Sequence, residues 1–90
     1  MEKIIIDVHG RVQGVFFRHN TRKRAKRWNL KGYVQNMPDG SVHIEAVGKE
    51  ENLNKLLKFA KKGPRLARVD DIEYTYEESS GEFDGFTVRY

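Results

Sequence analysis

The stretch "LKGYVQNMPDGSVHIEAV", Leu30 to Val47, decides the fold because it holds two strand patterns joined by a turn. Residues 30–37 have the composition of a strand, and in residues 41–47 Val42, Ile44 and Ala46 alternate with other side chains, which is typical of a half-buried strand. Between them, Pro38 fixes one backbone dihedral and Gly40 permits a positive one, as a tight turn requires. We therefore expect an antiparallel hairpin in the middle of the chain.

A helical pattern flanks the hairpin on each side. In residues 49–64, two glutamates open the first turn, and a Gly-Pro pair ends the helix after two lysines. Its buried stripe should consist of Leu53, Leu56, Leu57 and Ala60. In residues 17–28 the spacing is again helical, with basic side chains between the apolar ones. The stripe of this helix should consist of Phe17, Thr21, Ala25 and Trp28.

Strand patterns lie outside both helices. Residues 3–12 and 68–78 alternate with period two, and residues 86–90 add a short final strand. The order is β-α-β-β-α-β plus that last strand. We predict an α+β, ferredoxin-like split βαβ fold, with two helices packed on one face of a mostly antiparallel sheet. Residues 1–90 should form a single domain. This fold carries many unrelated activities, so the function must be argued from the residues.

Composition narrows the class of protein. The 90 residues include 17 Lys and Arg against 13 Asp and Glu, a net charge of +4, which favours anionic partners or simply a solvated basic surface. There is no cysteine, so disulfides, thiolate metal sites and cysteine nucleophiles are excluded. No apolar run is long enough to cross a membrane, and no signal peptide is recognisable. We expect a cytoplasmic monomer; the many charged residues would also suit a thermophile.

The stretch "GRVQGVFFR", Gly10 to Arg18, breaks the first strand just before a helix. At that point the first helical N–H groups lack partners and the helix dipole is positive. Gly14 would let the backbone curl so that successive N–H groups point inward and bind an anion. Arg18 is electrostatically misplaced in a first turn unless an anion lies beside it. The alternative is an ordinary strand-to-helix turn with a surface arginine; Walker and Rossmann glycine patterns are both absent.

Two stretches resemble the signatures of the acylphosphatase family. The first signature is matched by Gly10, Val12, Gln13, Gly14, Val15, Phe17 and Arg18, and the second by Gly32, Tyr33, Val34, Asn36, Gly40, Val42 and Gly48. Phe16 stands where many members have glycine, and the closing "GFTVRY" is also similar. The resemblance covers essentially the whole chain.

The resemblance implies a hydrolase that splits acyl phosphates into a carboxylate and inorganic phosphate. Arg18 and the backbone amides of Gln13, Gly14, Val15, Phe16, Phe17 and Arg18 would bind the phosphoryl group. Asn36 would orient the attacking water, since a carboxamide can donate and accept hydrogen bonds. The leaving carboxylate needs no proton donor, because its conjugate acid has a pKa of about 4 to 5, as carboxylic acids typically do. No metal and no cofactor are implied.

Two other classes of protein are alternatives to a hydrolase: an RNA-binding domain and a regulatory domain without catalysis. "KGYV" at residues 31–34 begins like the RNP1 motif of RNA-recognition domains, but Val34 and Gln35 do not continue it, and the segment falls on the second strand rather than the third. A regulatory domain without catalysis would not need both Arg18 and Asn36. The chain should therefore bind an acyl phosphate or another small anion, and neither nucleic acid nor membrane.

Several residues have simpler explanations. His9, His19 and His43 lack the spacing of metal ligands, and Asp70 and Asp71 point to opposite faces of a strand. Without its place in the signature, Asn36 would be an ordinary turn residue. Thr21 fits the buried stripe of its helix better than a functional site.

We also hypothesise that the carboxylate of Tyr90 lies near Arg18 and holds it in place.

Overall fold

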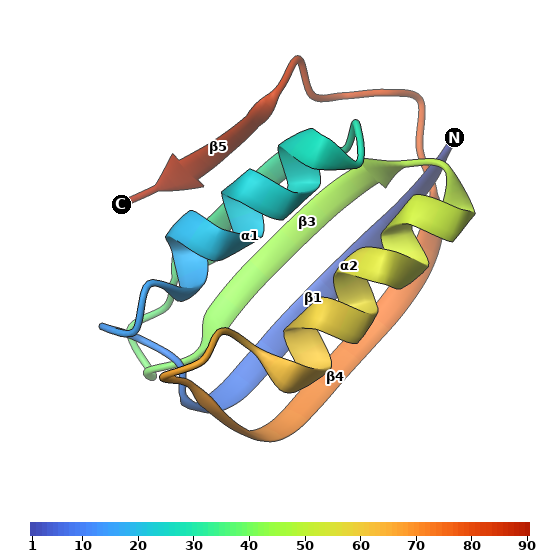
Figure 1. Ribbon diagram of the computed structural model, residues 1–90. Helices are drawn as coiled ribbons and strands as arrows, with labels where there is room; N and C mark the ends of the chain where they lie inside the picture. Colours follow the sequence, from blue (N-terminus) through green and yellow to red (C-terminus); the bar gives the residue numbers. More distant parts are fainter.

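The computed structural model describes residues 1–90 and contains the elements in the expected order (Figure 1). The strands are β1 (Glu2–Arg11), β2 (Lys31–Asn36), β3 (Val42–Gly48), β4 (Arg68–Glu78) and β5 (Phe86–Arg89), and the helices are α1 (Phe17–Arg27) and α2 (Glu50–Lys62). Both helices cover the same face of the sheet (Figure 1). The ferredoxin-like α+β prediction is thus confirmed. Neither helix is long and apolar enough to span a bilayer.

The strand order across the sheet is β4-β1-β3-β2-β5. The first four strands pair antiparallel, and β2 and β3 form the expected hairpin. β5 pairs parallel with β2, with Phe86 beside Gly32 and Val88 beside Val34. The sequence did not indicate this partner. Its consequence is that the end of β5 lies next to the end of β2 and close to the start of α1 (Figure 1).

The core lies between the helices and the sheet. Ile4, Ile6 and Val8 of β1 are completely buried, as the alternation predicted. The buried residues of α2 are the four expected ones, Leu53, Leu56, Leu57 and Ala60. In α1 the buried residues are Phe17, Thr21 and Ala25, whereas Trp28 follows the helix and is only partly buried against the core.

The glycines of the two signature stretches serve different purposes. Gly10 and Gly32 have φ of +132° and +148°, and a Cβ at either position would overlap a backbone carbonyl of the neighbouring strand. These two residues therefore allow the strands to approach closely. Gly14 has φ of +73° but no heavy atom near the position of its missing Cβ. It shapes the loop before α1 rather than the sheet.

The open face of the sheet carries a charged network. Lys3 forms ion pairs with Glu45 and Glu82, both at 2.9 Å, and Glu45 also accepts hydrogen bonds from Tyr33 and His43. Burial acts to raise the pKa of Glu45, but the hydrogen bonds from His43, Lys3 and Tyr33 outweigh it and hold the pKa at about 2. Burial and the bond to Glu45 raise the pKa of the Tyr33 hydroxyl to about 12.

Candidate active site

A cavity of about 570 Å³ opens where the loop before α1, the end of β2 and the end of β5 meet. Its lining comes from all three segments and from the first turns of α1. The lining residues are Val12, Gly14, Phe16, Phe17, Arg18, His19, Arg22, Asn36, Thr87, Val88 and Tyr90. The cavity thus brings Arg18 and Asn36 together with part of the predicted phosphate-binding loop.

The loop before α1 is built from alternating anchored and exposed residues. Val15 and Phe17 are buried in the core, whereas Gly14 and Phe16 face solvent. Gly14 and Phe16 have φ of +73° and +62°, both in the left-handed region. The side chains of Val15 and Phe17 therefore fix the loop, and its backbone and the exposed side chain of Phe16 are left accessible from the cavity.

The backbone N–H groups of this loop are unpaired within the chain. The first N–H of the helix that finds a carbonyl is that of Asn20, which donates to Phe16 at 3.0 Å. No N–H from residues 14 to 19 donates to a protein acceptor. α1 also begins without a side-chain cap and without an acidic residue in its first turn. The start of α1 is therefore a run of free donors at the positive end of a helix dipole.

Arg18 lies in the first turn of α1 and reaches toward β5. Its Nη1 is 3.5 Å from the carbonyl oxygen of Arg89, and its guanidinium carbon is 4.7 Å from the centre of the Tyr90 ring. None of the ion pairs in the structure involves Arg18. The hypothesis that the Tyr90 carboxylate holds Arg18 is therefore wrong: the ring and a backbone carbonyl hold it, which leaves the positive charge without a counter-charge.

Asn36 is the last residue of β2, and its backbone stays in the ladder opposite Val42. Its side chain lines the cavity, and its Oδ1 is buried without a hydrogen-bond partner. A buried amide oxygen without a partner is uncommon, because it loses its hydrogen bonds to water and gains none from the protein. This atom is an unused acceptor on a residue that lines the same cavity as the loop with the free N–H groups.

The side chain of Gln13 connects the loop to the hairpin. Its Nε2 donates to the carbonyl oxygens of Met37 and Ser41 at 2.8 and 2.9 Å. Because Met37 directly follows Asn36, these two bonds fix the distance between the loop and the carboxamide. The sequence pointed only to the backbone amide of Gln13, since nothing in the local pattern shows that the turn after β2 lies within reach.

The remaining candidates are engaged elsewhere or lie at the rim. Thr21 is buried and donates to the carbonyl of Phe17 at 2.8 Å, as a member of the helix stripe. His43 lies between Asp7 and Glu45 on the open face. His19 and Arg22 do line the cavity, and sequence reasoning did not include them in the site. Arg22 lies one turn after Arg18 and therefore on the same side of α1, and His19 is the neighbour of Arg18 in the first turn.

Other exposed groups are also accounted for. His9 contacts Glu73, and Asp70 pairs with Arg68. The Tyr33 ring, which starts the RNP1-like segment, is covered by the guanidinium of Arg89 at 3.6 Å. It is therefore not free to stack on a base. No three His, Asp or Glu side chains are grouped so that they could hold a metal ion.

Comparison with known proteins identifies the family of this chain. Residues 4–88 match the acylphosphatase family. The chain is 41% identical over 88 residues to an acylphosphatase of Salinibacter ruber, covering 98% of this chain and 93% of the relative, and 46% identical over 89 residues to one of Caldivirga maquilingensis, covering 98% and 94%. The crystal structure of acylphosphatase from Bacillus subtilis superposes over 100% of both chains with a TM-score of 0.95 at 37% identity. The chain therefore belongs to the acylphosphatase family.

Proposed function

We propose that this acylphosphatase hydrolyses acyl phosphates by attack of a water molecule, held by Asn36, on a phosphoryl group bound by Arg18 and the loop before α1. Phosphoryl transfer requires little covalent chemistry from a protein. It depends on placing the reactants in line and stabilising the charge on the phosphoryl oxygens. The cavity offers groups for both tasks.

The phosphoryl oxygens are bound by the free N–H groups of residues 14–18 and by the guanidinium of Arg18. These donors need no rearrangement, because Val15 and Phe17 fix the loop in the core. The planar guanidinium can donate to two oxygens at once. An anion in this position also removes the unfavourable interaction between Arg18 and the positive end of α1.

The attacking water donates a hydrogen bond to Oδ1 of Asn36. Its oxygen attacks phosphorus, and the bond between phosphorus and the acyl oxygen breaks on the opposite side. The electron pair leaves with the carboxylate, which is stable at neutral pH because carboxylic acids have pKa values of about 4 to 5. The proton of the water passes to a phosphoryl oxygen, so the products are a carboxylate and dihydrogen phosphate. No general acid is required.

One observation carries the proposal: Asn36, whose buried Oδ1 has no hydrogen-bond partner, lines the same cavity as Arg18 and the loop whose N–H groups are unpaired. The test is the release of phosphate from benzoyl phosphate. Asn36→Ala should reduce kcat at least about 100-fold, as the loss of one well-placed polar group in a site does. The inhibition constant of inorganic phosphate should change less than threefold, because Asn36 binds the water and not the product.

Asn52→Ala is the matched control, since Asn52 lies in the first turn of α2 and outside the cavity. It should retain full activity. Equal losses of kcat and of phosphate affinity in Asn36→Ala would contradict the division of roles between Asn36 and Arg18. Because Arg18 and the backbone supply the positive charge in this mechanism, we also expect turnover to be unchanged by EDTA.

A further inference from the structure

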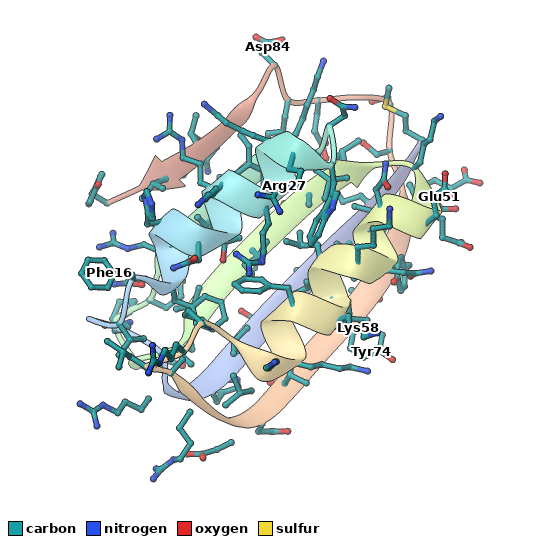
Figure 2. The ribbon with its side chains drawn as sticks, in the orientation of Figure 1. Phe16, Arg27, Glu51, Lys58, Tyr74 and Asp84 are labelled. Carbon is teal, nitrogen blue, oxygen red and sulfur yellow. The ribbon has the colours of Figure 1, made fainter.

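Phe16 occupies a position that the fold itself does not explain. It is the residue before α1, its φ of +62° is in the left-handed region, and its side chain is 70% exposed. A bulky residue in that region is strained, and glycine would relieve the strain. Figure 2 shows the ring projecting from the loop away from both helices. The ring therefore costs stability and gains no burial in return.

A second exposed aromatic ring lies on the same cavity. Tyr90 is 96% exposed, and it lines the cavity together with Phe16 and Val88. Five large apolar side chains of the chain are exposed, and two of them, including the most exposed, line this cavity. Exposed apolar groups that cluster at a cavity usually mark a binding surface.

The direction of the proposed reaction explains what these rings would contact. In the proposed reaction the attacking water is held by the carboxamide of Asn36, whose Oδ1 is buried at the end of β2. In an in-line displacement the leaving group lies on the opposite side of phosphorus. The acyl group therefore lies on the side of phosphorus away from Asn36, and Phe16 and Tyr90 are the exposed aromatic side chains of the cavity that could contact it.

We infer that Phe16 determines acyl specificity: with Tyr90 it forms an apolar wall that favours substrates with a flat, aromatic acyl group. This inference rests on the proposed function and adds the class of substrate. Arg22 could instead favour an acyl group with a second negative charge. This alternative is weaker, because Arg22 belongs to a face of α1 that is basic along its whole length. The two rings, by contrast, are the most exposed aromatic side chains of the protein, and both line this cavity.

The test compares kcat/KM for benzoyl phosphate, acetyl phosphate and succinyl phosphate. The carboxylate leaving groups have similar pKa values of about 4 to 5, so differences in rate report on binding of the acyl group. The wild-type protein should prefer benzoyl over acetyl phosphate by about five- to tenfold, which is what an aromatic contact can contribute. In Phe16→Gly this ratio should fall to near one. The N–H of residue 16 is retained, so inhibition by inorganic phosphate should stay within threefold of wild type.

Tyr74→Ala is the matched control, because Tyr74 is an exposed aromatic residue on the far side of the molecule (Figure 2). Its benzoyl-to-acetyl ratio should equal that of wild type. An unchanged ratio in Phe16→Gly, with both substrates still hydrolysed, overturns the inference about Phe16 and leaves the proposed function intact. A preference for succinyl phosphate that disappears in Arg22→Ala also overturns it. If wild type hydrolyses none of the three substrates, the proposed function fails as well.

Discussion

The two helices of this protein begin in opposite ways. α2 starts with Glu50 and Glu51 in its first turn, which suits the positive end of a helix dipole. α1 starts with Phe16 in a left-handed conformation, has no acidic residue there and carries Arg18 instead. Both helices bury an apolar stripe on the same sheet face. The start of α2 thus suits its own dipole, whereas the start of α1 is left with unpaired N–H groups and a cation, which is what the proposed anion site would explain.

The largest effect is expected when Arg18, the cation at the start of α1, is replaced. Arg18→Ala should lower kcat/KM for benzoyl phosphate at least 100-fold, a loss of roughly 3 kcal/mol, because a charge-assisted contact to a desolvated phosphoryl group disappears. The thermal midpoint should stay the same or rise slightly, since a cation at a helix N-terminus is unfavourable. Arg27→Ala, in the last turn of the same helix, is the control and should keep full activity. Comparable losses in both variants would show that α1 needs only its overall charge.

In α2 we expect a substitution to reduce stability and to leave activity nearly unchanged. Leu56 is completely buried in its stripe, and Leu56→Ala should lower the free energy of unfolding by about 3 kcal/mol, as cavity-forming substitutions do. Urea denaturation measures this loss. Turnover per folded molecule should remain within twofold of wild type. A variant that stays folded but loses activity would mean that α2 also shapes the site.

A third test concerns the loss of stability at low pH, which we expect to arise on the open face of the sheet and not in either helix. The pKa of Glu45 in the folded protein is about 2, below its ordinary 4.5, so the stabilisation is present above pH 4.5 and is lost as the pH falls through 2. We expect the free energy of unfolding to fall by about 2 kcal/mol over that range. His43 has the opposite sign: its pKa is raised despite burial by bonds to Glu45 and Asp7, so its contribution disappears as the pH rises through the folded value.

Urea midpoints between pH 2 and pH 7 give the measurement. Glu45→Gln should remove most of the loss below pH 4.5, while Glu51→Gln in α2 should leave it unchanged. An identical acid profile in wild type and Glu45→Gln would place the sensitive group elsewhere.

A smaller effect is expected where the loop before α1 is tied to the hairpin. Gln13→Glu keeps the size of the side chain but removes both donors to Met37 and Ser41. We expect kcat/KM to fall about tenfold and the free energy of unfolding to fall by about 1 kcal/mol. As a positioning residue, Gln13 should act on kcat more than on phosphate inhibition. Gln35→Glu, on the adjacent hairpin strand, is the control, and an equal loss there would point to added charge as the cause.

The smallest effects come from exchanging the electrostatics of the two helix starts. Glu51→Gln should destabilise the fold by about 0.5 kcal/mol and leave activity unchanged. His19→Glu places an acid in the first turn of α1 and should stabilise the fold by a similar amount, while it raises the inhibition constant of phosphate several-fold. Thermal midpoints with and without phosphate measure both. Improved phosphate binding in His19→Glu would contradict an anion site at this helix start.

The same contrast explains how far sequence reasoning could go. The stripe of α2, the alternation of β1 and the turn at Pro38 to Gly40 are local patterns, and each was predicted correctly. The predicted site residues Arg18 and Asn36 do line one cavity, but their roles stay predictions. Those residues were found through a resemblance that spans the chain, since an asparagine before a turn carries little information by itself.

What the sequence missed depends on distances between remote segments. β5 has four residues, and nothing in them selects β2 as a partner or a parallel direction. Tyr90 was expected near Arg18, but the contact by its ring instead of its carboxylate depends on that pairing and could not be read from the sequence. The brace formed by Gln13 depends on the turn after β2 coming within 3 Å of a loop more than twenty residues earlier.

The pairing of β1 also constrains how the molecule folds. This central strand has no partner nearby in the chain: Val8 pairs with Val42 and Glu2 with Glu78. Only the hairpin of β2 and β3 can form early from local contacts, and the rest of the sheet requires closure of long loops, which slows folding. The segment that carries Asn36 can thus be ordered first, while its cavity exists only after the slow, long-range step that brings the N-terminal strand alongside. Catalytic competence should therefore return during refolding with the last kinetic phase and not with the first.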